Sequence, residues 1–573
     1  MKIKHLFGLA VIAAMTASCS SNEDLGTAGP GTGTNETGVG YATFTINLPS
    51  VSGTRAADAG GAEMDEGTAK EYAVKSATAL IFQKYGSDEG SCKFVESVDL
   101  PTAAADWTDD TTVGITTTKK LVAKLTNVDT KNQYYVLVLL NNNKKTGGVK
   151  VALPTVGQSY NEWNSQILRP SVDDLAADND FYMANAPLKG TASPTTLVTI
   201  DKENIYSSKE KAEAGTSAAT VYVERGVAKM SVNDPKTKTV IDKATNTSTQ
   251  STVEFNNWAL DITNKKTYAV HNIDGLSTDF PDIWTTPRFI GTNSRVYWGK
   301  DPNYNLDNLN TGKEAEREAE FNFIKATSGI NKTFTESAYC LENTFNLANM
   351  YQGQTTRVIF KATYTPKDAA GNPLADKDGT FYTIGNMTTI LKAEALETAV
   401  NTAATSVLPG CTVDYTNLKQ EGSHVITLAD IKDSTGTTLV ADKVYSGKTG
   451  TEIVKEINDK LGLIDGAGHA EAMVGINTYA QGVTYYIARV KHFGSLTPWN
   501  SGESYGTNNL KYLGRYGMLR NNWYELTVGN VYGPGYPGVP PVDPNQPDDE
   551  NEKYLSVSVK ILSWAKRSDT VDL

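Results

Sequence analysis

The chain has 573 residues, of which 39% are hydrophobic, and its formal net charge is −12. This length exceeds what a single hydrophobic core organises, so two or three domains are expected. The acidic balance argues against nucleic acid as the main partner, because phosphate binding requires a basic face. The 28 tyrosines and the frequent threonines favour β-sheet.

Residues 1–18 form a predicted lipoprotein signal peptide. Lys2 and Lys4 precede the apolar run LFGLAVIAAMTA, which is too short to cross a bilayer. Small residues stand directly before Cys19, as in a bacterial lipobox, although Thr16 replaces the usual leucine. We expect Cys19 to be acylated and the acidic SSNED after it to direct the protein to the outer cell surface; the alternative is an ordinary secretory signal cut elsewhere.

The first predicted strand follows a Gly/Thr-rich spacer at residues 20–40. Residues 41–48 alternate apolar and polar side chains, which predicts a half-buried strand. Its apolar positions are Ala42, Phe44, Ile46 and Leu48. The loop after this strand contains one arginine, Arg55, among small residues, and an exposed loop of that kind is a good protease site.

Strand patterns dominate the rest of the chain, with few helices between them. Two β-sandwich-like domains are the economical interpretation, with a polar run near residues 235–250 at their boundary. Strands are predicted in residues 72–83, 134–143, 195–200, 219–232, 253–264, 355–366, 485–494 and 523–533. The main predicted helix covers residues 451–464, and we place the domains at residues 56–240 and 241–533.

The chain ends in another alternating strand behind a linker. Residues 534–553 are rich in proline and acidic side chains and are expected not to fold. Residues 554–573 then contain the apolar positions Leu555, Val557, Val559 and Ile561, with Trp564 in a following segment that should also pack. A strand on a tether needs a partner for its backbone groups, and that partner is either its own domain or another copy of the chain.

Motifs for catalysis or metal binding are absent from the sequence, so no enzyme and no cofactor are expected. The pattern Asp301, Asn303, Asn305 and Asp307 resembles a calcium loop, but Leu306 occupies the turn-glycine position and Gly312 the place of the bidentate glutamate, so a polar turn is the preferred interpretation.

The three remaining cysteines are spaced too widely for a metal site; they are Cys92, Cys340 and Cys411. They are expected to be buried apolar residues, with one disulfide as the alternative. Trp258, Trp284, Trp298 and Trp499 could form a glycan platform but more often such residues pack in a core.

Several short segments, in their order along the chain, resemble the fimbrillins of Bacteroidota, the subunits of type V pili, and among them the Mfa-type major subunit. The segments are ATFTINLPSVSGTRA, VYVERGVAKM, YWGKDPNYN, YCLENTFNLAN, YYIARVKHFG, RNNWYELTV and SVKILSWAKRSDTVDL. The resemblance covers nearly the whole chain. It implies a mainly β, transthyretin-like fold with few short helices and a C-terminal donor strand.

The resemblance also implies a mechanism. An Arg-specific protease would cut between Arg55 and Ala56 and remove residues 19–55 with the lipid and the first strand. The vacated groove would then accept the C-terminal strand of another copy, which is donor-strand complementation as known in pilins. Such a head-to-tail contact grows into a filament when it does not close. Partners would be other copies, accessory tip and anchor subunits, and a ligand on a host or bacterial surface.

Two other interpretations stay open. Within the family, the chain could be an accessory tip or anchor subunit, although a complete C-terminal strand favours the shaft. From a different class, it could be a monomeric surface lipoprotein that binds glycans. In every case the only expected membrane attachment is through the lipid of the precursor.

Overall fold

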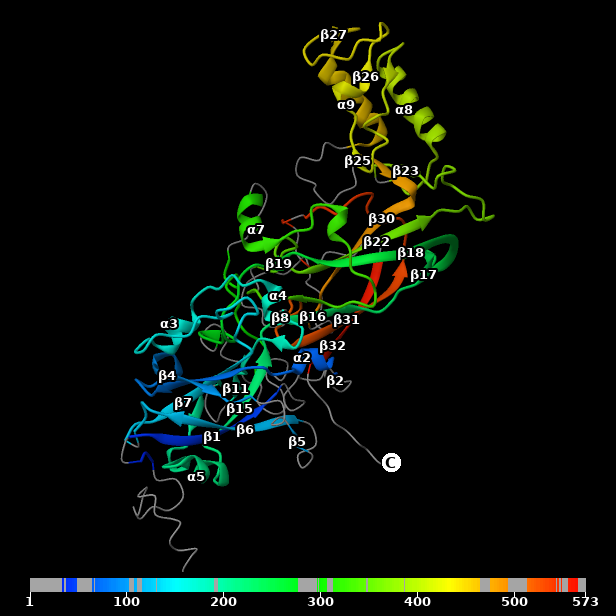
Figure 1. Ribbon diagram of the computed structural model, residues 1–573. Helices are drawn as coiled ribbons and strands as arrows, with labels where there is room; N and C mark the ends of the chain where they lie inside the picture. The colour runs from blue at the N-terminus through cyan, green and yellow to red at the C-terminus, as the bar shows by residue number, and fades with distance from the viewer. Residues whose placement is uncertain are drawn as a thin grey trace, which may run out of the picture.

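The computed structural model shows an elongated molecule made of three consecutive parts (Figure 1). An N-terminal sheet lies at one end, a C-terminal sheet in the middle, and a small helix-containing insertion at the other end. The structure describes residues 33–35, 38–48, 64–65, 67–102, 108–110, 116–129, 131–189, 194–276, 296, 298–306, 313–346, 349–385, 387–463, 475–492, 513–542, 544–545, 548 and 555–564.

The N-terminal part is a ten-stranded sheet with the strand order β4-β3-β7-β10-β15-β1-β6-β5, to which β13 and β14 pair at the side. The sheet curls over so that β4 lies close to β6, which makes it sandwich-like around one core. Its strands are β1 (Gly40–Asn47), β3 (Ala77–Gln83), β4 (Lys93–Leu100), β5 (Thr108–Asp110), β6 (Thr116–Leu125), β7 (Tyr134–Leu140), β10 (Met183–Asn185), β13 (Val198–Ile200), β14 (Ile205–Tyr206) and β15 (Ala219–Arg225).

Short helices and two-residue ladders decorate this sheet. The helices are α2 (Ala69–Tyr72), α3 (Tyr160–Asn164), α4 (Val172–Leu175) and α5 (Lys209–Ala214). The short ladders are β8 (Ala176–Ala177) with β9 (Asp180–Phe181), and β11 (Leu188–Lys189) with β12 (Pro194–Thr195). Each helix is too short to be stable alone, so tertiary packing holds it in place.

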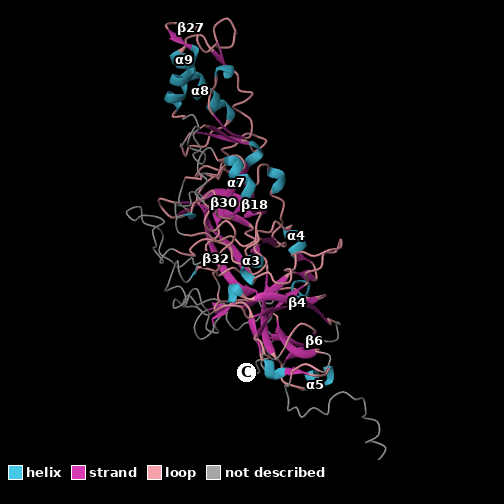
Figure 2. Ribbon diagram, turned by 90° about the vertical axis from the view of Figure 1, so that its left-hand side faces the viewer, coloured by secondary structure: helices cyan, strands magenta, loops and turns pink. Residues whose placement is uncertain are grey.

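The C-terminal part is a nine-stranded sheet with the order β2-β32-β31-β17-β18-β22-β30, in which β16 also pairs with β31 and β21 pairs with β16. Its strands are β2 (Met64–Asp65), β16 (Ala228–Val232), β17 (Thr237–Asp242), β18 (Thr247–Asp261), β21 (Ala338–Cys340), β22 (Arg357–Thr365), β30 (Val483–Arg489), β31 (Asn522–Val531) and β32 (Leu555–Trp564). Beside it lie α7 (Glu314–Glu320) and the ladder of β19 (Thr263–Asn264) with β20 (Phe321–Asn322). Strands outnumber helices throughout (Figure 2), and the mainly β fold with few helices is therefore confirmed.

The insertion between β22 and β30 has a hydrophobic core of its own. Its elements are β23 (Phe381–Ile384), α8 (Ala393–Val407), β24 (Thr412–Val413), β25 (Gly422–His424), β26 (Ile431–Lys432), β27 (Val444–Tyr445), β28 (Lys448–Thr449), α9 (Gly450–Leu461) and β29 (Ile476–Tyr479). Helix α9 matches the predicted helix at residues 451–464. It begins with a capping box between Thr449 and Glu452 and ends at Gly462, whose φ of 68° suits glycine.

Three features differ from the sequence-based expectations. The polar run expected at a domain boundary is the β17–β18 hairpin, because its threonines form a solvated sheet face opposite the buried Val240 and Val253. The chain passes from the first sheet to the second between Arg225 and Ala228, upstream of the expected boundary at residue 240. Helix α8 carries buried residues at helical spacing, a signal that the strand-based interpretation missed.

Candidate functional site

Strand β1 is an interior strand of the N-terminal sheet, between β15 and β6 (Figure 1). It runs antiparallel to β6 from Gly40↔Leu125 to Asn47↔Thr118, and parallel to β15 from Phe44↔Ala219 to Asn47↔Tyr222. A strand paired on both sides leaves two open ladders when it is removed. We call the space that β1 fills between β6 and β15 the β1 slot.

The apolar face of β1 is buried in the core of the N-terminal part. Ala42, Phe44 and Ile46 are fully buried, and Leu48 is 3% exposed. These residues belong to one core cluster with Leu121 and the strands of the opposite layer. The slot therefore has an apolar floor that needs four side chains to fill it.

The other face of β1 is covered too, which differs from the half-buried strand predicted from the alternation. Helix α5 packs over it, and Thr43 is only 2% exposed. The Thr43 hydroxyl donates to the carbonyl oxygen of Ala212 at 2.6 Å, and Thr45 shares a hydrogen bond of 2.7 Å with Ser217. At the end of the strand, the Thr118 hydroxyl donates to Asn47 Oδ1 at 2.7 Å. This face of the slot is matched to small polar side chains.

The C-terminal strand β32 pairs antiparallel with β31 of its own domain. The register places Leu555, Val557, Val559 and Ile561 opposite Val531, Val528, Leu526 and Tyr524, respectively. All four partners on β31 are buried. In the single chain the terminal strand thus completes its own C-terminal sheet.

A short strap connects the segment after β1 to this terminal strand. Strand β2 pairs with β32 through Met64↔Ser563 and Asp65↔Trp564. A few residues later, Glu71 is 2% exposed and forms a 2.8 Å ion pair with Lys229 of β16. The strap is therefore anchored where the two large parts of the molecule meet.

The linker before β32 is bound to the domain in the residues that the structure describes, contrary to the expectation that it would not fold. The Arg357 guanidinium donates to the carbonyl oxygens of Pro540 and Pro541 at 2.7 and 3.1 Å. The Thr355 hydroxyl donates to the buried Asp548 carboxylate at 2.5 Å. Proline lacks an N–H but keeps a carbonyl acceptor, so a proline-rich segment can still dock on a fixed arginine.

The other predicted site residues are only partly described. Cys19, Arg55 and Ala56 lie outside the described residues, and so do Asp307, Gly312, Trp284 and Trp499. Trp258 and Trp298 are fully buried, as expected of core residues. Cys92, Cys340 and Cys411 are buried free thiols, which confirms the preferred interpretation of their role.

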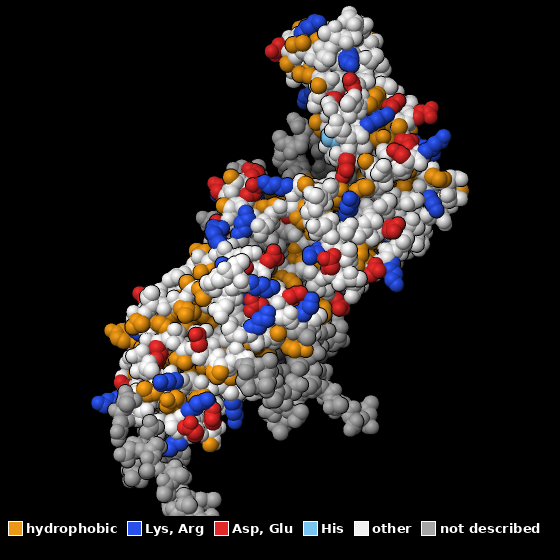
Figure 3. Space-filling view, in the orientation of Figure 1, with side chains coloured by type: hydrophobic (Ala, Val, Ile, Leu, Met, Phe, Trp, Pro, Cys, Tyr) orange, Lys and Arg blue, Asp and Glu red, His pale blue; other side chains and the backbone are white. Residues whose placement is uncertain are grey.

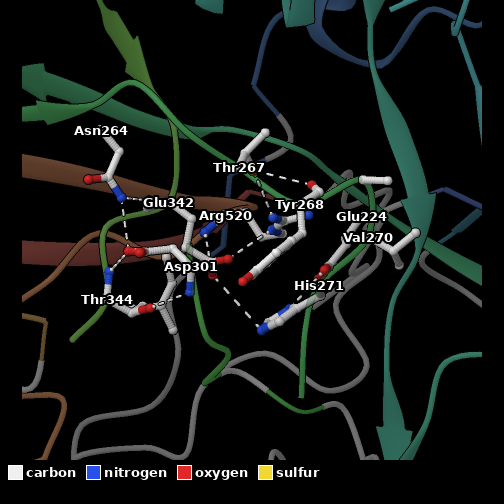
Figure 4. A network of polar contacts seen from close by, with 12 residues as sticks. Glu224, Asn264, Thr267, Tyr268, Val270, His271, Asp301, Glu342, Thr344 and Arg520 are labelled. Atoms are coloured by element: carbon white, nitrogen blue, oxygen red, sulfur yellow. Dashed lines mark hydrogen bonds and ion pairs between the residues drawn. The ribbon is translucent and has the colours of Figure 1, made fainter. Parts of the chain in front are cut away.

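A buried polar network joins the N-terminal and C-terminal parts (Figure 4). His271 Nδ1 lies 2.9 Å from the Glu224 carboxylate, and its Nε2 lies 3.9 Å from Glu342. Arg520 Nε donates to Glu342 at 3.1 Å, and the guanidinium also reaches the Thr267 hydroxyl at 3.2 Å. Because every one of these five side chains is buried, the network holds the two parts together rather than facing a substrate.

Asp301 belongs to the same network. Its carboxylate accepts hydrogen bonds from the backbone N–H groups of Asn303 and Thr344, both at 2.5 Å, and from Asn264 Nδ2 at 2.9 Å. Burial raises the pKa of Asp301 to about 7. The described half of the calcium-like pattern is therefore a polar turn tied to protein groups, and within the described residues no cluster of three metal-ligand side chains occurs.

The residues of this junction come from segments that lie far apart in the sequence. Glu224, Asp301, Glu342 and Arg520 stand in VYVERGVAKM, YWGKDPNYN, YCLENTFNLAN and RNNWYELTV, respectively. These segments carry the family resemblance, but their sequences do not by themselves predict that they meet. Their shared enrichment in charged and Asn residues beside apolar strands was the available signal.

The visible surface carries mixed charge. In Figure 3, acidic and basic side chains are interspersed along the described face of all three parts. Among the helices that the structure describes, none is long and apolar enough to span a bilayer.

Comparison with known families decides the assignment. Residues 477–570 match the family model of the major fimbrial subunit protein type IV, fimbrillin, C-terminal. Over these residues the chain is similar to the C-terminal region of fimbrillins. This region includes β30, β31 and β32, and it confirms the resemblance that the sequence motifs indicate. The fimbrillin match supports a fimbrial subunit, a class of protein found on the cell surface.

Three solved structures have distant similarity to this chain. A Parabacteroides distasonis protein with a proposed role in cell adhesion is 10% identical, with a TM-score of 0.34, over 91% of this chain and 99% of its own. A fimbrial assembly protein of the same organism is 13% identical, with a TM-score of 0.26, over 61% and 93%. The tip fimbrial protein Mfa3 of Porphyromonas gingivalis, with a C-terminal truncation, is 10% identical, with a TM-score of 0.29, over 91% and 100%. No curated protein matches the chain.

Proposed function

We propose that this protein is a shaft subunit of a surface fimbria, which serves adhesion, biofilm formation and colonisation. It is exported with lipid on Cys19, cut by an Arg-specific protease between Arg55 and Ala56, and polymerised by donor-strand exchange with other copies. One observation carries the proposal: β1, the first strand in the described residues, is an interior strand of its sheet and precedes a segment that contains a single arginine.

If β1 were lost, binding of a new strand in the slot would be strongly favourable in free energy. Each large apolar side chain buried there is worth about 1.5–3 kcal/mol, and two unpaired ladders would face solvent. A strand with Leu555, Val557, Val559 and Ile561 at alternate positions would contribute about 6–12 kcal/mol before the cost of ordering it. Until cleavage, β1 itself prevents this exchange.

Exchange also requires β32 to leave its own domain. In the described residues, β32 pairs with β31 along one edge and with Met64 and Asp65 of β2 on the other. After departure β31 would still be paired with β16 and β17. Release of the terminal strand therefore breaks one long ladder with β31 and the short ladder with β2, and the slot of a neighbouring copy compensates for its lost contacts.

Limited proteolysis tests the proposal. Residues 20–573 are treated with a low dose of an Arg-specific protease, the new N-terminus is sequenced, and the product is imaged by negative-stain electron microscopy. We expect a terminus at Ala56 and filaments. The variant Arg55→Ala should remain uncut and monomeric, and filaments from it would show that β1 does not act as a plug.

The remaining interpretations make different predictions in the same experiment. A tip or anchor subunit, or a monomeric glycan-binding lipoprotein, would be cut at Arg55 or resist cutting, and would stay monomeric when incubated with its own copies. Binding to immobilised saccharides would then separate the glycan-binding protein from the accessory subunits.

A further inference from the structure

The sequence around β1 and the sequence around β32 match each other position by position. Residues 41–48 read YATFTINL and residues 554–561 read YLSVSVKI. Both begin with tyrosine and then alternate an apolar residue with a polar one. In both, the first two polar positions are small hydroxyl residues, which are Thr43 and Thr45 in one strand and Ser556 and Ser558 in the other.

The two faces of the slot require different side chains from the strand that fills it. Its floor holds the apolar residues of β1, and Ala42 and Phe44 are fully enclosed there. Its roof under α5 offers the Ala212 carbonyl oxygen and the Ser217 hydroxyl to the hydroxyls of Thr43 and Thr45. A replacement strand must therefore supply small hydroxyl side chains as well as apolar ones.

We infer that the terminal strand of a second copy enters the slot in one register and one direction. Tyr554 takes the place of Tyr41 and Lys560 that of Asn47, and the strand runs parallel to β15 as β1 does. Ser556 and Ser558 then take over the hydrogen bonds of Thr43 and Thr45. This inference rests on the proposed strand exchange and adds its register and orientation.

Other registers in the same direction conflict with the slot. A shift by one residue turns every apolar side chain to the polar face. A shift by two in one sense places Lys553 where Ala42 is fully buried, and a charge without a partner is costly there. A shift by two in the other sense places Leu562 at Asn47, beside the Thr118 hydroxyl, and Ser563 at Leu48.

The reversed direction conflicts with the slot as well. It would place Lys560 at Thr43, which is 2% exposed beneath α5. In the inferred direction Lys560 instead lies at Asn47, which is 6% exposed but is the last residue of β1, so the long lysine side chain can reach past the end of the strand. The apolar volume is nearly conserved, since the larger Leu555 at Ala42 adjoins the smaller Val557 at Phe44.

Disulfide trapping between two variants tests the register. The side chains of Thr118 and Asn47 touch, so a cysteine at 118 reports which donor residue lies opposite. Thr118→Cys protein is mixed with one of four donor variants, Ser556→Cys, Ser558→Cys, Lys560→Cys or Leu562→Cys. Each mixture is cleaved, polymerised and oxidised, and non-reducing electrophoresis then reports disulfide-linked pairs.

We expect the Lys560→Cys mixture to form the linked pair at least tenfold more than the other three. Preferential linkage through Ser556→Cys would indicate the reversed strand, and linkage through Ser558→Cys or Leu562→Cys a shifted one; each of these results overturns the inference. Wild-type protein is the control for the buried Cys92, Cys340 and Cys411.

A second pair of cysteine variants, at the other end of the slot, keeps the test decisive if one variant of the first pair does not fold. Tyr41 lies opposite Lys124 on β6, so a mixture of Lys124→Cys with Tyr554→Cys should also be trapped. Filaments without linkage at either end would overturn the register while leaving the exchange intact. Monomers from cleaved wild-type protein would overturn the exchange itself.

Discussion

At the scale of single residues, Glu71 makes the contacts that anchor the segment following the predicted cleavage site. Its carboxylate receives the Lys229 ammonium and the Tyr339 hydroxyl, the latter at 2.5 Å, and its backbone carbonyl oxygen accepts from Arg225 Nε at 2.9 Å. Burial by itself would raise the pKa of Glu71, but Lys229 and the hydrogen bonds from Tyr339 and Thr68 outweigh it, so the pKa is lowered.

Glu71→Gln should lower the free energy of unfolding by about 3–5 kcal/mol at neutral pH, because it leaves the buried Lys229 ammonium without this carboxylate. A lowered pKa means that the carboxylate stabilises the fold above its ordinary value of 4.5 and loses that effect as the pH falls through the folded pKa. The difference between the two proteins in urea unfolding should therefore be large at pH 7 and shrink at pH 3.

The exposed pair of Lys70 with Asp178 provides the matched control for Glu71. Both side chains are more than half exposed although their charged atoms are 2.8 Å apart. Lys70→Gln should change the free energy of unfolding by less than about 1 kcal/mol. An equal loss from both substitutions would contradict the anchoring role of Glu71.

At the scale of elements, β1 should stabilise the precursor but not the polymer. Phe44→Ala removes a fully buried ring and should destabilise the uncut protein by about 3–5 kcal/mol. After cleavage β1 is gone, so filaments from Phe44→Ala and wild-type protein should unfold at the same denaturant concentration. Phe82→Ala is the matched control, because Phe82 is equally buried in β3, which the mature protein keeps. A weakened Phe44→Ala filament would show that β1 stays in place.

At the scale of the whole molecule, the slot and the terminal strand lie in different parts of an elongated chain (Figure 1). Exchange between copies is then heterologous and extends in one direction. Val557→Asp should leave both large parts folded yet abolish filaments, because an aspartate is disfavoured in the slot. Lys560→Gln, which resembles the Asn47 it would replace, should polymerise normally. Electron microscopy of the cleaved variants distinguishes these outcomes, and filaments from Val557→Asp would exclude the donor role.

Much of the fold could be predicted because its cause is local. The strands at residues 41–48 and at the C-terminus were predicted from the two-residue period of a strand. The capped, amphipathic helix α9 was predicted from helical spacing. The β17–β18 hairpin was not predicted because a threonine-rich segment carries a weak periodic signal and its burial depends on distant neighbours. Helix α8 was not predicted although its apolar residues stand at helical spacing.

The sequence by itself determined that one alternating strand lies near the start of the chain and another near its end. Alternation can be read directly from the order of consecutive residues, so it needs no knowledge of tertiary contacts. Only the tertiary structure decided that β1 is enclosed on both faces, that β32 docks on β31, and that Glu224, Glu342 and Arg520 meet in one buried network. Such long-range pairings depend on how loops close and surfaces fit, which no short stretch of sequence encodes.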